Sequence, residues 1–246
     1  MDNPPPPESP DLKILAIDVG GSGLKAAVLD AEGNMLTERV RVKTPHPCTP
    51  EILLTEITKL VGLLSGHEFN RISVGFPGVI RRGVILTAAN LGPELRGFAL
   101  ADALSQHLGH PCRVINDADM QGLAAVHGHG VEIVITLGTG MGSAMFSEGQ
   151  LAPHLELAHH PFRKGETYEE QIGNFALEKV GPKKWNRRVK LAVATLRTLT
   201  TFDRLYLGGG NAKLVDFKLE NDVEVIDNTN GIKGGAWLWR QNAQPA

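Results

Sequence analysis

Between Lys13 and Leu29 the chain reads KILAIDVGGSGLKAAVL. Two apolar runs of strand length flank the turn Gly20-Gly21-Ser22-Gly23, so we predict a strand, a glycine-rich turn and a second strand. The glycine motifs of P-loop and dinucleotide-binding proteins instead lie between a strand and a helix. This stretch therefore argues against both of those nucleotide-binding classes.

The pattern of strand, glycine turn and strand occurs again in the second half of the chain. The apolar run 131–137 ends in the turn 138–142, whose sequence is Gly-Thr-Gly-Met-Gly, and a further strand follows over 143–146. We interpret this repeat as a weak internal duplication. It predicts an α/β fold with two lobes of similar topology around a cleft.

A third glycine cluster, 208–211, follows a predicted strand over 203–207. The remaining apolar periodicities predict strands over 35–42, 71–76, 112–115 and 223–226 and helices over 49–64, 100–108, 119–128, 168–180, 185–201 and 231–240. We expect three parts: a disordered proline-rich tail over 1–11, an N-terminal lobe over 12–118 and a C-terminal lobe over 119–246. The last helix is expected to return to the N-terminal lobe.

The composition is that of an ordinary globular protein. The 246 residues are 42% hydrophobic and 21% charged, with a formal net charge of -2, and no apolar run is long enough to cross a bilayer. The N-terminus has no basic start and no apolar core, so we expect no secretory signal, no membrane partner and a cytoplasmic location. The two cysteines, Cys48 and Cys112, are too few for a disulfide framework. The overall charge predicts no nucleic-acid partner.

The glycine clusters are candidate phosphate sites. In such turns the backbone N–H groups can converge on an anion, and the glycines let the chain approach it closely. We therefore assign phosphate binding to the first turn, with its residues Gly20, Gly21, Ser22 and Gly23. Asp18 is a candidate Mg²⁺ ligand, directly or through water, and Lys25 is a candidate phosphate contact. The alternatives are turns without a ligand and, for Asp18, a hydrogen bond within its own turn.

A second candidate site lies at Asn116-Asp117, where the apolar run 112–115 ends abruptly. A carboxylate at the carboxyl end of a strand is well placed to face a ligand in an α/β fold, so Asp117 is a candidate general base. The alternative is that Asp117 or Asp119 caps the helix that follows. Because Asp119 leads directly into that helix, we assign the cap to Asp119 and the base to Asp117.

Several segments, taken together, resemble the ROK family of sugar kinases. They are Asp18–Lys25, Phe76-Pro77-Gly78, Asn116–Asp119, Leu137–Ser143 and Leu207–Asn211, in the order of the family. Within that family, segments 155–169 and 183–189 resemble the polyphosphate glucokinases, and the resemblance covers residues 13–240. It implies an actin-like, ribonuclease H-like ATPase fold. It also implies a homodimeric kinase that transfers a phosphoryl group from polyphosphate or ATP, with Mg²⁺, to the 6-hydroxyl of glucose.

The resemblance implies a role for individual residues. Asp117 matches the base that takes the proton of the sugar 6-hydroxyl. The positions that match sugar contacts are Asn90, Asn116, Glu156, His159 and Glu169. The positions that match the second phosphate turn are Gly138, Thr139 and Gly140, and those that match the nucleoside region are Gly209, Gly210 and Asn211.

A basic segment contrasts with the overall charge. Between residues 181 and 204 seven cations accompany one acid, Asp203. Such an excess is typical of a polyanion-binding surface, and the segment carries no nucleic-acid recognition motif. We therefore interpret it as a track for inorganic polyphosphate. The alternative is a solvated helix face. The cations that we expect to guide the polymer are Lys183, Lys184, Arg187 and Arg188.

The sequence departs from the wider family at two places. Most ROK proteins carry a cysteine-rich zinc motif just after the region of His159, but no cysteine follows Cys112 here. We therefore expect no zinc site, and the alternative is a metal held by His154, His159 and His160. Polyphosphate glucokinases share this loss. Asp119 stands where many members have asparagine, and we expect little consequence beyond helix capping.

Other functions stay open at this point. An ATP-only hexokinase that accepts glucose and mannose would use the same residues. A sugar-binding transcriptional regulator would need an N-terminal helix-turn-helix domain, and only residues 1–12 precede the first predicted strand. A filament-forming actin relative would not need the sugar-binding set Glu156, His159 and Glu169.

Overall fold

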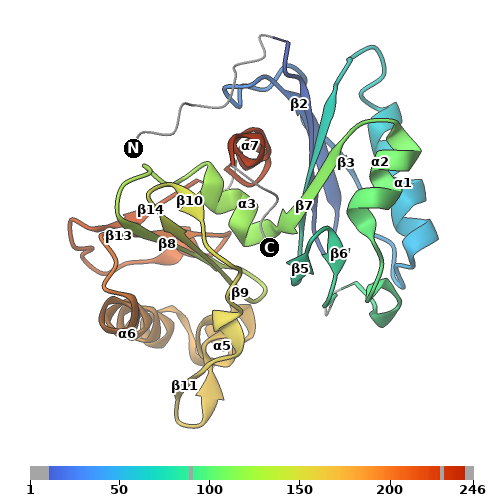
Figure 1. The fold of residues 1–246 in the computed structure, drawn as a ribbon. Coiled ribbons are helices and arrows are strands. Elements are labelled where there is room, and N and C mark those ends of the chain that lie inside the picture. Colours follow the sequence, from blue (N-terminus) through green and yellow to red (C-terminus); the bar gives the residue numbers. More distant parts are fainter. Residues whose placement is uncertain (1–10, 89–90, 228–229, 242–246) are drawn as a thin grey trace. The chain divides into compact units, whose positions relative to one another are not determined.

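The computed structural model describes residues 11–88, 91–227 and 230–241. The chain divides into two units, and Figure 1 labels many of their elements. Unit 1 comprises Met1–Ala124 together with Gly231–Ala246, and unit 2 comprises Ala125–Asn230. Each unit is built on its own five-stranded sheet. The C-terminal segment therefore belongs with the first half of the chain.

The sheet of unit 1 has the strand order β3-β2-β1-β4-β7. The strands are Ile14–Val19 (β1), Leu24–Leu29 (β2), Val40–Val42 (β3), Arg71–Phe76 (β4) and Cys112–Asn116 (β7). The first three form an antiparallel meander, and β4 and β7 continue the sheet parallel to β1. The carboxyl ends of β1, β4 and β7 therefore meet at one edge, which is where ligands bind in open α/β sheets. We call it the carboxyl edge.

Helices cover both faces of this sheet (Figure 1). Helices α1 (Pro50–Gly62) and α2 (Leu100–Leu108) share one core with alternate residues of β1, such as Leu15 and Ile17. Helix α7 (Asn230–Trp237) shares a second core with Ile14 and Ala16. Since successive strand residues point to opposite faces, a strand buried on both sides must be apolar throughout. This explains the uninterrupted apolar run before the first glycine turn.

Unit 2 repeats this topology, with the strand order β10-β9-β8-β13-β14. The strands are Val131–Leu137 (β8), Met141–Ser147 (β9), Gln150–Leu151 (β10), Arg204–Gly208 (β13) and Val223–Val225 (β14). Again an antiparallel meander is continued by two parallel strands. The second glycine turn joins β8 to β9, as the first joins β1 to β2. The predicted duplication is confirmed, and the repeated sheet is that of the actin-like ATPase fold.

The helices of unit 2 share a single core with its sheet. They are α4 (Tyr168–Ile172), α5 (Asn174–Val180) and α6 (Pro182–Thr200). Trp185 of α6 is fully buried in this core and donates its indole N–H to the carbonyl of Ile172 at 2.8 Å. The indole thus ties α6 to the end of α4.

Short elements complete the structure. They are the hairpins β5–β6 (Ile80–Arg81, Val84–Ile85) and β11–β12 (Pro161–Arg163, Glu166–Thr167), helix α3 (Asp117–Leu123), and the 3₁₀ turns η1 (Pro93–Leu95), η2 (Leu157–His159), η3 (Ala212–Leu214) and η4 (Leu238–Arg240). Among the residues described, no helix combines the length and the apolar character needed to span a membrane.

Three predicted elements differ from the observed ones. The predicted strand 35–42 shrinks to β3, because the hydroxyl of Thr37 accepts the N–H of Val28 at 3.1 Å in place of a backbone carbonyl. The predicted helix 168–180 is interrupted at Gly173, where a Cβ would lie 2.8 Å from the carbonyl oxygen of Glu169. The predicted helix 119–128 is observed as α3, which starts and ends earlier.

A buried carboxylate organises the start of the sheet in unit 2. Glu132 of β8 is fully buried and accepts hydrogen bonds from the Tyr206 hydroxyl at 2.6 Å and from the N–H groups of residues 127–129 at 2.6–3.2 Å. Burial raises the pKa of Glu132, but the hydroxyl and the N–H groups outweigh it and hold the pKa below its usual value. The carboxylate therefore anchors the loop that precedes β8.

Glu132→Gln should lower the free energy of unfolding by about 2 kcal/mol at neutral pH, because a neutral amide replaces an acceptor of charge-assisted bonds. The folded-state pKa of Glu132 lies below the unfolded-state value, so this stability is present above the unfolded-state value and is lost as the pH falls. Urea unfolding of both proteins at neutral pH and at about pH 4 measures the difference, which should narrow in acid. Glu224→Gln, at an exposed position on β14, is the control. Equal losses in the two variants would contradict this role.

Candidate active site

The cap of α3 is Asn116, and the assignment of the cap to Asp119 was wrong. The Asn116 side-chain oxygen accepts the N–H groups of Ala118 at 2.8 Å and Asp119 at 3.3 Å. Because β7 runs into α3 without a linker, the residue at the helix boundary is Asn116, and Asp119 lies buried in the first turn. The Asn116 amide N–H₂ donates to the carbonyl of Gly78 at 3.1 Å. The sugar contact of Asn116 stays a prediction.

Asp117 follows at the first position of α3, on the carboxyl edge of the sheet. It is half-buried, and this burial together with the negative charges of Asp18 and Asp119 raises its pKa from 3.8 to about 7. The N–H of Ala118, 2.9 Å from the carboxylate, opposes this rise. A carboxyl group that exchanges its proton near neutral pH is suited to general acid–base chemistry. The local geometry therefore fits the predicted base.

Asp18 is the last but one residue of β1 and lies on the same edge. Its carboxylate is 2.8 Å from the ammonium group of Lys25, its partner on β2. Mg²⁺ in phosphoryl-transfer sites is held by one or two carboxylates, while phosphate oxygens and water complete its octahedron. A single partly exposed carboxylate beside a glycine turn matches this donor set. Among the described residues, no cluster of three or more histidine, cysteine or acidic side chains has metal-site geometry.

The first glycine turn is closed by two backbone bonds between Gly20 and Gly23, at 3.1 and 3.4 Å. Side chains of a later segment support it. The buried hydroxyl of Thr44 donates to the carbonyl of Gly20 at 2.6 Å, and the Nε2 of His46 lies 2.7 Å from the carbonyl of Gly21. The sequence predicted no element between the strand 35–42 and the helix 49–64, so it gave Thr44 and His46 no role. Their position just after the strand that pairs with β2 was the available signal.

The second glycine turn has its own support within unit 2. Thr136 accepts the N–H of Gly142 through its hydroxyl at 2.9 Å, and the N–H of Asn174 donates to the carbonyl of Gly138 at 3.0 Å. The carboxylate of Glu169, from α4, occupies the space that a Cβ on Gly140 would need. The structure therefore brings the predicted sugar residue Glu169 against the predicted phosphate turn.

The other predicted sugar residues of unit 2 form a small cluster. The two carboxylate oxygens of Glu156 lie 2.9 Å from His154 and 3.5 Å from His159. The hydrogen bond from His154 is the main cause that lowers the pKa of Glu156, so this carboxylate is ionised. We had considered His154 only as a metal ligand; its spacing of two residues from Glu156 is the signal for the present pairing. The predicted contact Asn90 lies outside the described residues.

The third glycine cluster packs on the second. Gly209 has a φ of +86°, and a Cβ built on it would overlap the backbone of Leu137, so a side chain there would be both strained and obstructed. Asn211 donates its backbone N–H to the carbonyl of Leu137 at 2.9 Å and its amide to Asn174 at 3.3 Å. The clusters 138–142 and 208–211 therefore form one continuous glycine-rich surface at the ends of β8 and β13.

The basic segment is smaller than its sequence suggested. Arg197 is paired with Asp222 and, at 3.2 Å, with Glu220, two acids that lie outside the counted segment. Arg188 is half-buried and donates to the carbonyl of Gln171 at 3.2 Å. The exposed cations on the first turns of α6 are Lys183, Lys184, Arg187 and Lys190. We call these four residues the α6 patch.

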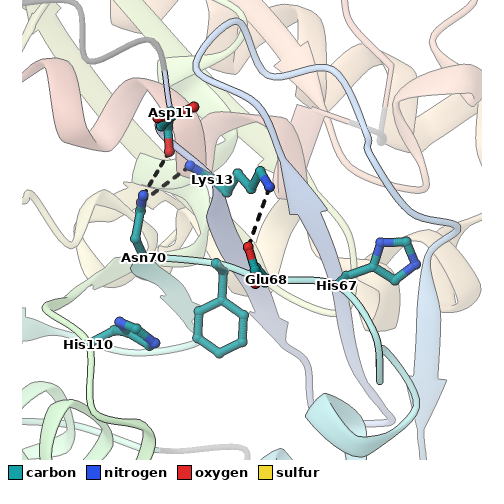
Figure 2. Close-up of a pocket in the computed structure, with 7 residues that line it drawn as sticks. Asp11, Lys13, His67, Glu68, Asn70 and His110 are labelled. Atoms are coloured by element: carbon teal, nitrogen blue, oxygen red, sulfur yellow. Dashed lines mark hydrogen bonds and ion pairs between the residues drawn. The ribbon is translucent and has the colours of Figure 1, made fainter.

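A separate hollow of about 600 Å³ lies in unit 1 (Figure 2). The residues that line it are Asp11, Lys13, His67, Glu68, Phe69, Asn70 and His110. They precede β1, β4 and β7, so the hollow lies at the amino edge of the sheet, opposite to the edge where such sheets bind ligands. Several of its polar groups bond one another, as Lys13 does with Glu68 at 3.9 Å. We therefore assign the chemistry to the carboxyl edge.

The duplicated sheet, its glycine turns and the carboxylates at the edge define an actin-like fold with the groups of a phosphotransferase. A profile of the ROK family matches residues 14–154, and the chain belongs to this family. Over 238 residues the chain is 32% identical to the polyphosphate glucokinase of Mycobacterium tuberculosis (strain ATCC 25618 / H37Rv). The match covers 89% of this chain and 88% of that protein. Over 146 residues the chain is 37% identical to the N-acetylmannosamine kinase of Shigella flexneri, and this match covers 57% of this chain and 49% of that protein.

Solved structures agree with this assignment. The inorganic polyphosphate/ATP-glucomannokinase from Arthrobacter sp. strain KM superposes with a TM-score of 0.83 at 32% identity, over 92% of this chain and 97% of that one. A ROK family glucokinase from Streptomyces griseus, solved with glucose and AMPPNP, gives a TM-score of 0.76 at 20% identity, over 92% and 98%. The second likeness supports the fold alone.

The Asp117 carboxyl should titrate near pH 7 when its ¹³C chemical shift is followed by NMR. Asp119→Asn should lower this midpoint, since it removes a negative charge that disfavours the ionised form. Asp102→Asn, at an exposed position on α2, is the matched control and should leave the midpoint unchanged. A midpoint near 4, or one that does not respond to Asp119→Asn, would contradict the assigned environment.

Proposed function

We propose that this protein is a glucokinase that transfers a phosphoryl group from inorganic polyphosphate or ATP to the 6-hydroxyl of glucose, giving glucose 6-phosphate. The observation that carries the proposal is Asp117, a half-buried carboxyl at the carboxyl edge whose pKa is raised to about 7. Asp18 lies at the end of β1 and the first glycine turn follows β1, so both occupy the same edge of the same sheet. The relatives named as polyphosphate glucokinase and glucomannokinase support the choice of substrates.

In the proposed reaction Asp117 takes the proton of the 6-hydroxyl while the sugar oxygen bonds to the terminal phosphorus of the donor. The bond between that phosphorus and the bridging oxygen breaks, and the shortened polymer or ADP leaves with the electron pair. Asn116 positions the base, because its amide joins the start of α3 to Gly78. The raised pKa makes the Asp117 carboxylate a stronger base for this proton than an ordinary aspartate, and Asp117 then returns the proton to solvent.

We assign Mg²⁺ to Asp18, directly or through water, with the donor phosphates as its other ligands. When bound, the metal neutralises charge on the phosphates that react. Lys25 holds the Asp18 carboxylate at 2.8 Å and is a second cation for the same phosphates. The turn Gly20, Gly21, Ser22 and Gly23 binds the donor phosphate through the N–H groups of Gly21 and Ser22, because those of Gly20 and Gly23 close the turn.

In unit 2 we propose that Glu156, His159 and Glu169 bind sugar hydroxyls. The ionised Glu156 accepts hydroxyl protons, and His154 holds it in place at 2.9 Å. Gly138, Thr139 and Gly140 bind donor phosphates, while Gly209, Gly210 and Asn211 receive the nucleoside when the donor is ATP. Asn90 and Asn116 stay candidate sugar contacts.

The direct test is a coupled assay for glucose 6-phosphate with each donor in turn, on glucose and on mannose. Product with polyphosphate and glucose supports the proposal, and product with ATP alone favours the hexokinase alternative. No product with either donor would overturn both. A homodimer, which the family resemblance implies, and a cytoplasmic location, which the N-terminal sequence predicts, stay predictions to be measured by light scattering and by cell fractionation.

Asp117→Asn should lower kcat by about 10²–10⁴-fold, the usual contribution of a general base. The amide has nearly the same shape, so glucose should still bind with a Kd close to that of the parent. Steady-state kinetics and calorimetric titration with glucose separate the two effects. Asp102→Asn on α2 is the control for a carboxylate lost elsewhere in unit 1. Turnover within about tenfold of the parent would return Asp117 to a structural role.

The α6 patch should act on the polymer more than on ATP. Gly181 starts α6 without a side-chain cap, so the free N–H groups of the helix and the cations of the patch attract anions at the same end. A long polyanion can contact several spaced cations at once, which the single triphosphate of ATP cannot do. This supports polyphosphate as the occupant of the patch.

Reversal of Lys183, Lys184 and Arg187 to glutamate should raise the KM for polyphosphate by about tenfold or more at low salt and change the KM for ATP by less than about twofold. Arg188 is left intact, because it donates to the carbonyl of Gln171. Lys218→Glu, an exposed position of unit 2 outside α6, is the control. An equal loss with both donors would contradict a separate polymer track.

A further inference from the structure

Three charged residues form a row across the sheet of unit 1. In the register of the sheet Asp18 of β1 lies opposite Lys25 of β2, and Lys25 lies opposite Arg41 of β3. Directly opposed residues point to the same face, so the three side chains share one side of the sheet beside the first glycine turn. Asp18 and Lys25 pair at 2.8 Å, which leaves the charge of Arg41 as the net charge of the row.

The guanidinium of Arg41 lies over Gly23. A Cβ built on Gly23 would come 2.5 Å from Nε and 2.9 Å from Nη2 of Arg41, so the absence of a side chain at Gly23 makes room for the guanidinium. Nη2 also donates to the carbonyl of Ser22 at 3.4 Å. The cation is thus held against the glycine turn while it stays exposed to solvent.

The turn itself is arranged to receive an anion. The carbonyls of Gly20, Gly21 and Ser22 accept from Thr44, His46 and Arg41, respectively. In the part of the chain that the structure describes, the N–H groups of Gly21 and Ser22 have no hydrogen-bond partner. The turn therefore has its carbonyls satisfied by side chains and two N–H donors left over, which suits a negatively charged ligand.

Arg41 has further N–H groups that can donate hydrogen bonds to the same ligand. A guanidinium carries five N–H groups, and a planar pair of them matches two oxygens of a phosphate. Within the described residues Arg41 makes the long bond to Ser22 and no ion pair. The positive charge of its neighbour Lys25 is already balanced by the carboxylate of Asp18.

We propose that Arg41 is a further donor-binding residue, which contacts the phosphate that the Gly20–Gly23 turn holds. This inference rests on the proposed function, in which that turn binds the phosphoryl donor. Every donor presents a phosphate to the turn, so Arg41 serves polyphosphate and ATP alike, whereas the α6 patch serves the polymer. Thr44 and His46 are positioning residues, because they act on the carbonyls of the turn.

The test compares Arg41→Gln with Arg39→Gln. Arg39 is exposed and lies two residues earlier, farther from the turn, so it controls for the loss of one positive charge on the same segment. Arg41→Gln should raise the KM for both donors by about tenfold or more and leave the KM for glucose within about twofold. Arg39→Gln should change the donor KM by less than about twofold.

A second variant tests the position of the guanidinium. Gly23→Ala places a methyl group where the Arg41 side chain lies, and the end of that side chain can move away. Gly23→Ala should raise the donor KM in the parent and add little in the Arg41→Gln background, since the two changes remove the same contact. Independent effects that simply add would contradict the proposal.

Binding of inorganic tripolyphosphate with Mg²⁺ to the 246-residue chain, measured by calorimetry, gives a readout without turnover. Weaker binding to Arg41→Gln, together with parent-like binding to Arg39→Gln, supports the anion contact even if the parent forms no glucose 6-phosphate, a result that would overturn only the proposed function. Equal binding to all three proteins, in a parent that does phosphorylate glucose, would overturn the role of Arg41 alone.

Discussion

The side-chain amide of Asn116 makes the contacts on which the carboxyl edge of unit 1 depends. Its oxygen caps α3 and its N–H₂ group binds the carbonyl of Gly78, so one side chain joins β7, α3 and the loop after β4. A cap is worth about 1 kcal/mol, and here it also sets the direction in which Asp117 leaves the sheet. The start of α3 therefore holds the proposed base, Asp117, in place.

The same edge also balances charge. The negative charges of Asp18 and Asp119 lie close enough to Asp117 to raise its pKa. Lys25 forms an ion pair with Asp18 at 2.8 Å, and Arg41, opposite Lys25 on β3, adds a second cation. Carboxylates in such proximity favour a bound proton or a bound cation. The arrangement is consistent with a site that receives a metal and phosphates together. A duplicated sheet supplies a second glycine-rich surface in unit 2 by the same strand connections.

Much of the fold and part of the site follow from local patterns. The strands around each glycine turn were predictable because a strand buried on both faces must be apolar and because glycine clusters end it. The start of α1 at Thr49-Pro50 follows from capping rules. The cap of α3 was assigned to the wrong residue, because Asn116, Asp117 and Asp119 all suit a cap and only the point where β7 ends selects one.

The sequence by itself determined which strands flank each glycine turn, where the turns lie, and which carboxylates, Asp18 and Asp117, lie where strands end. These features depend on neighbours within a few residues. Only the tertiary structure decided which distant side chains reach the turns. The pairing of β3 with β2 brings Arg41, Thr44 and His46 to the Gly20–Gly23 turn. The positive charge of Arg197 is not available to the basic segment, because Arg197 is paired with Asp222. Such contacts join residues about 20 or more positions apart. They depend on the pairing of distant segments, which no pattern within a few residues can predict.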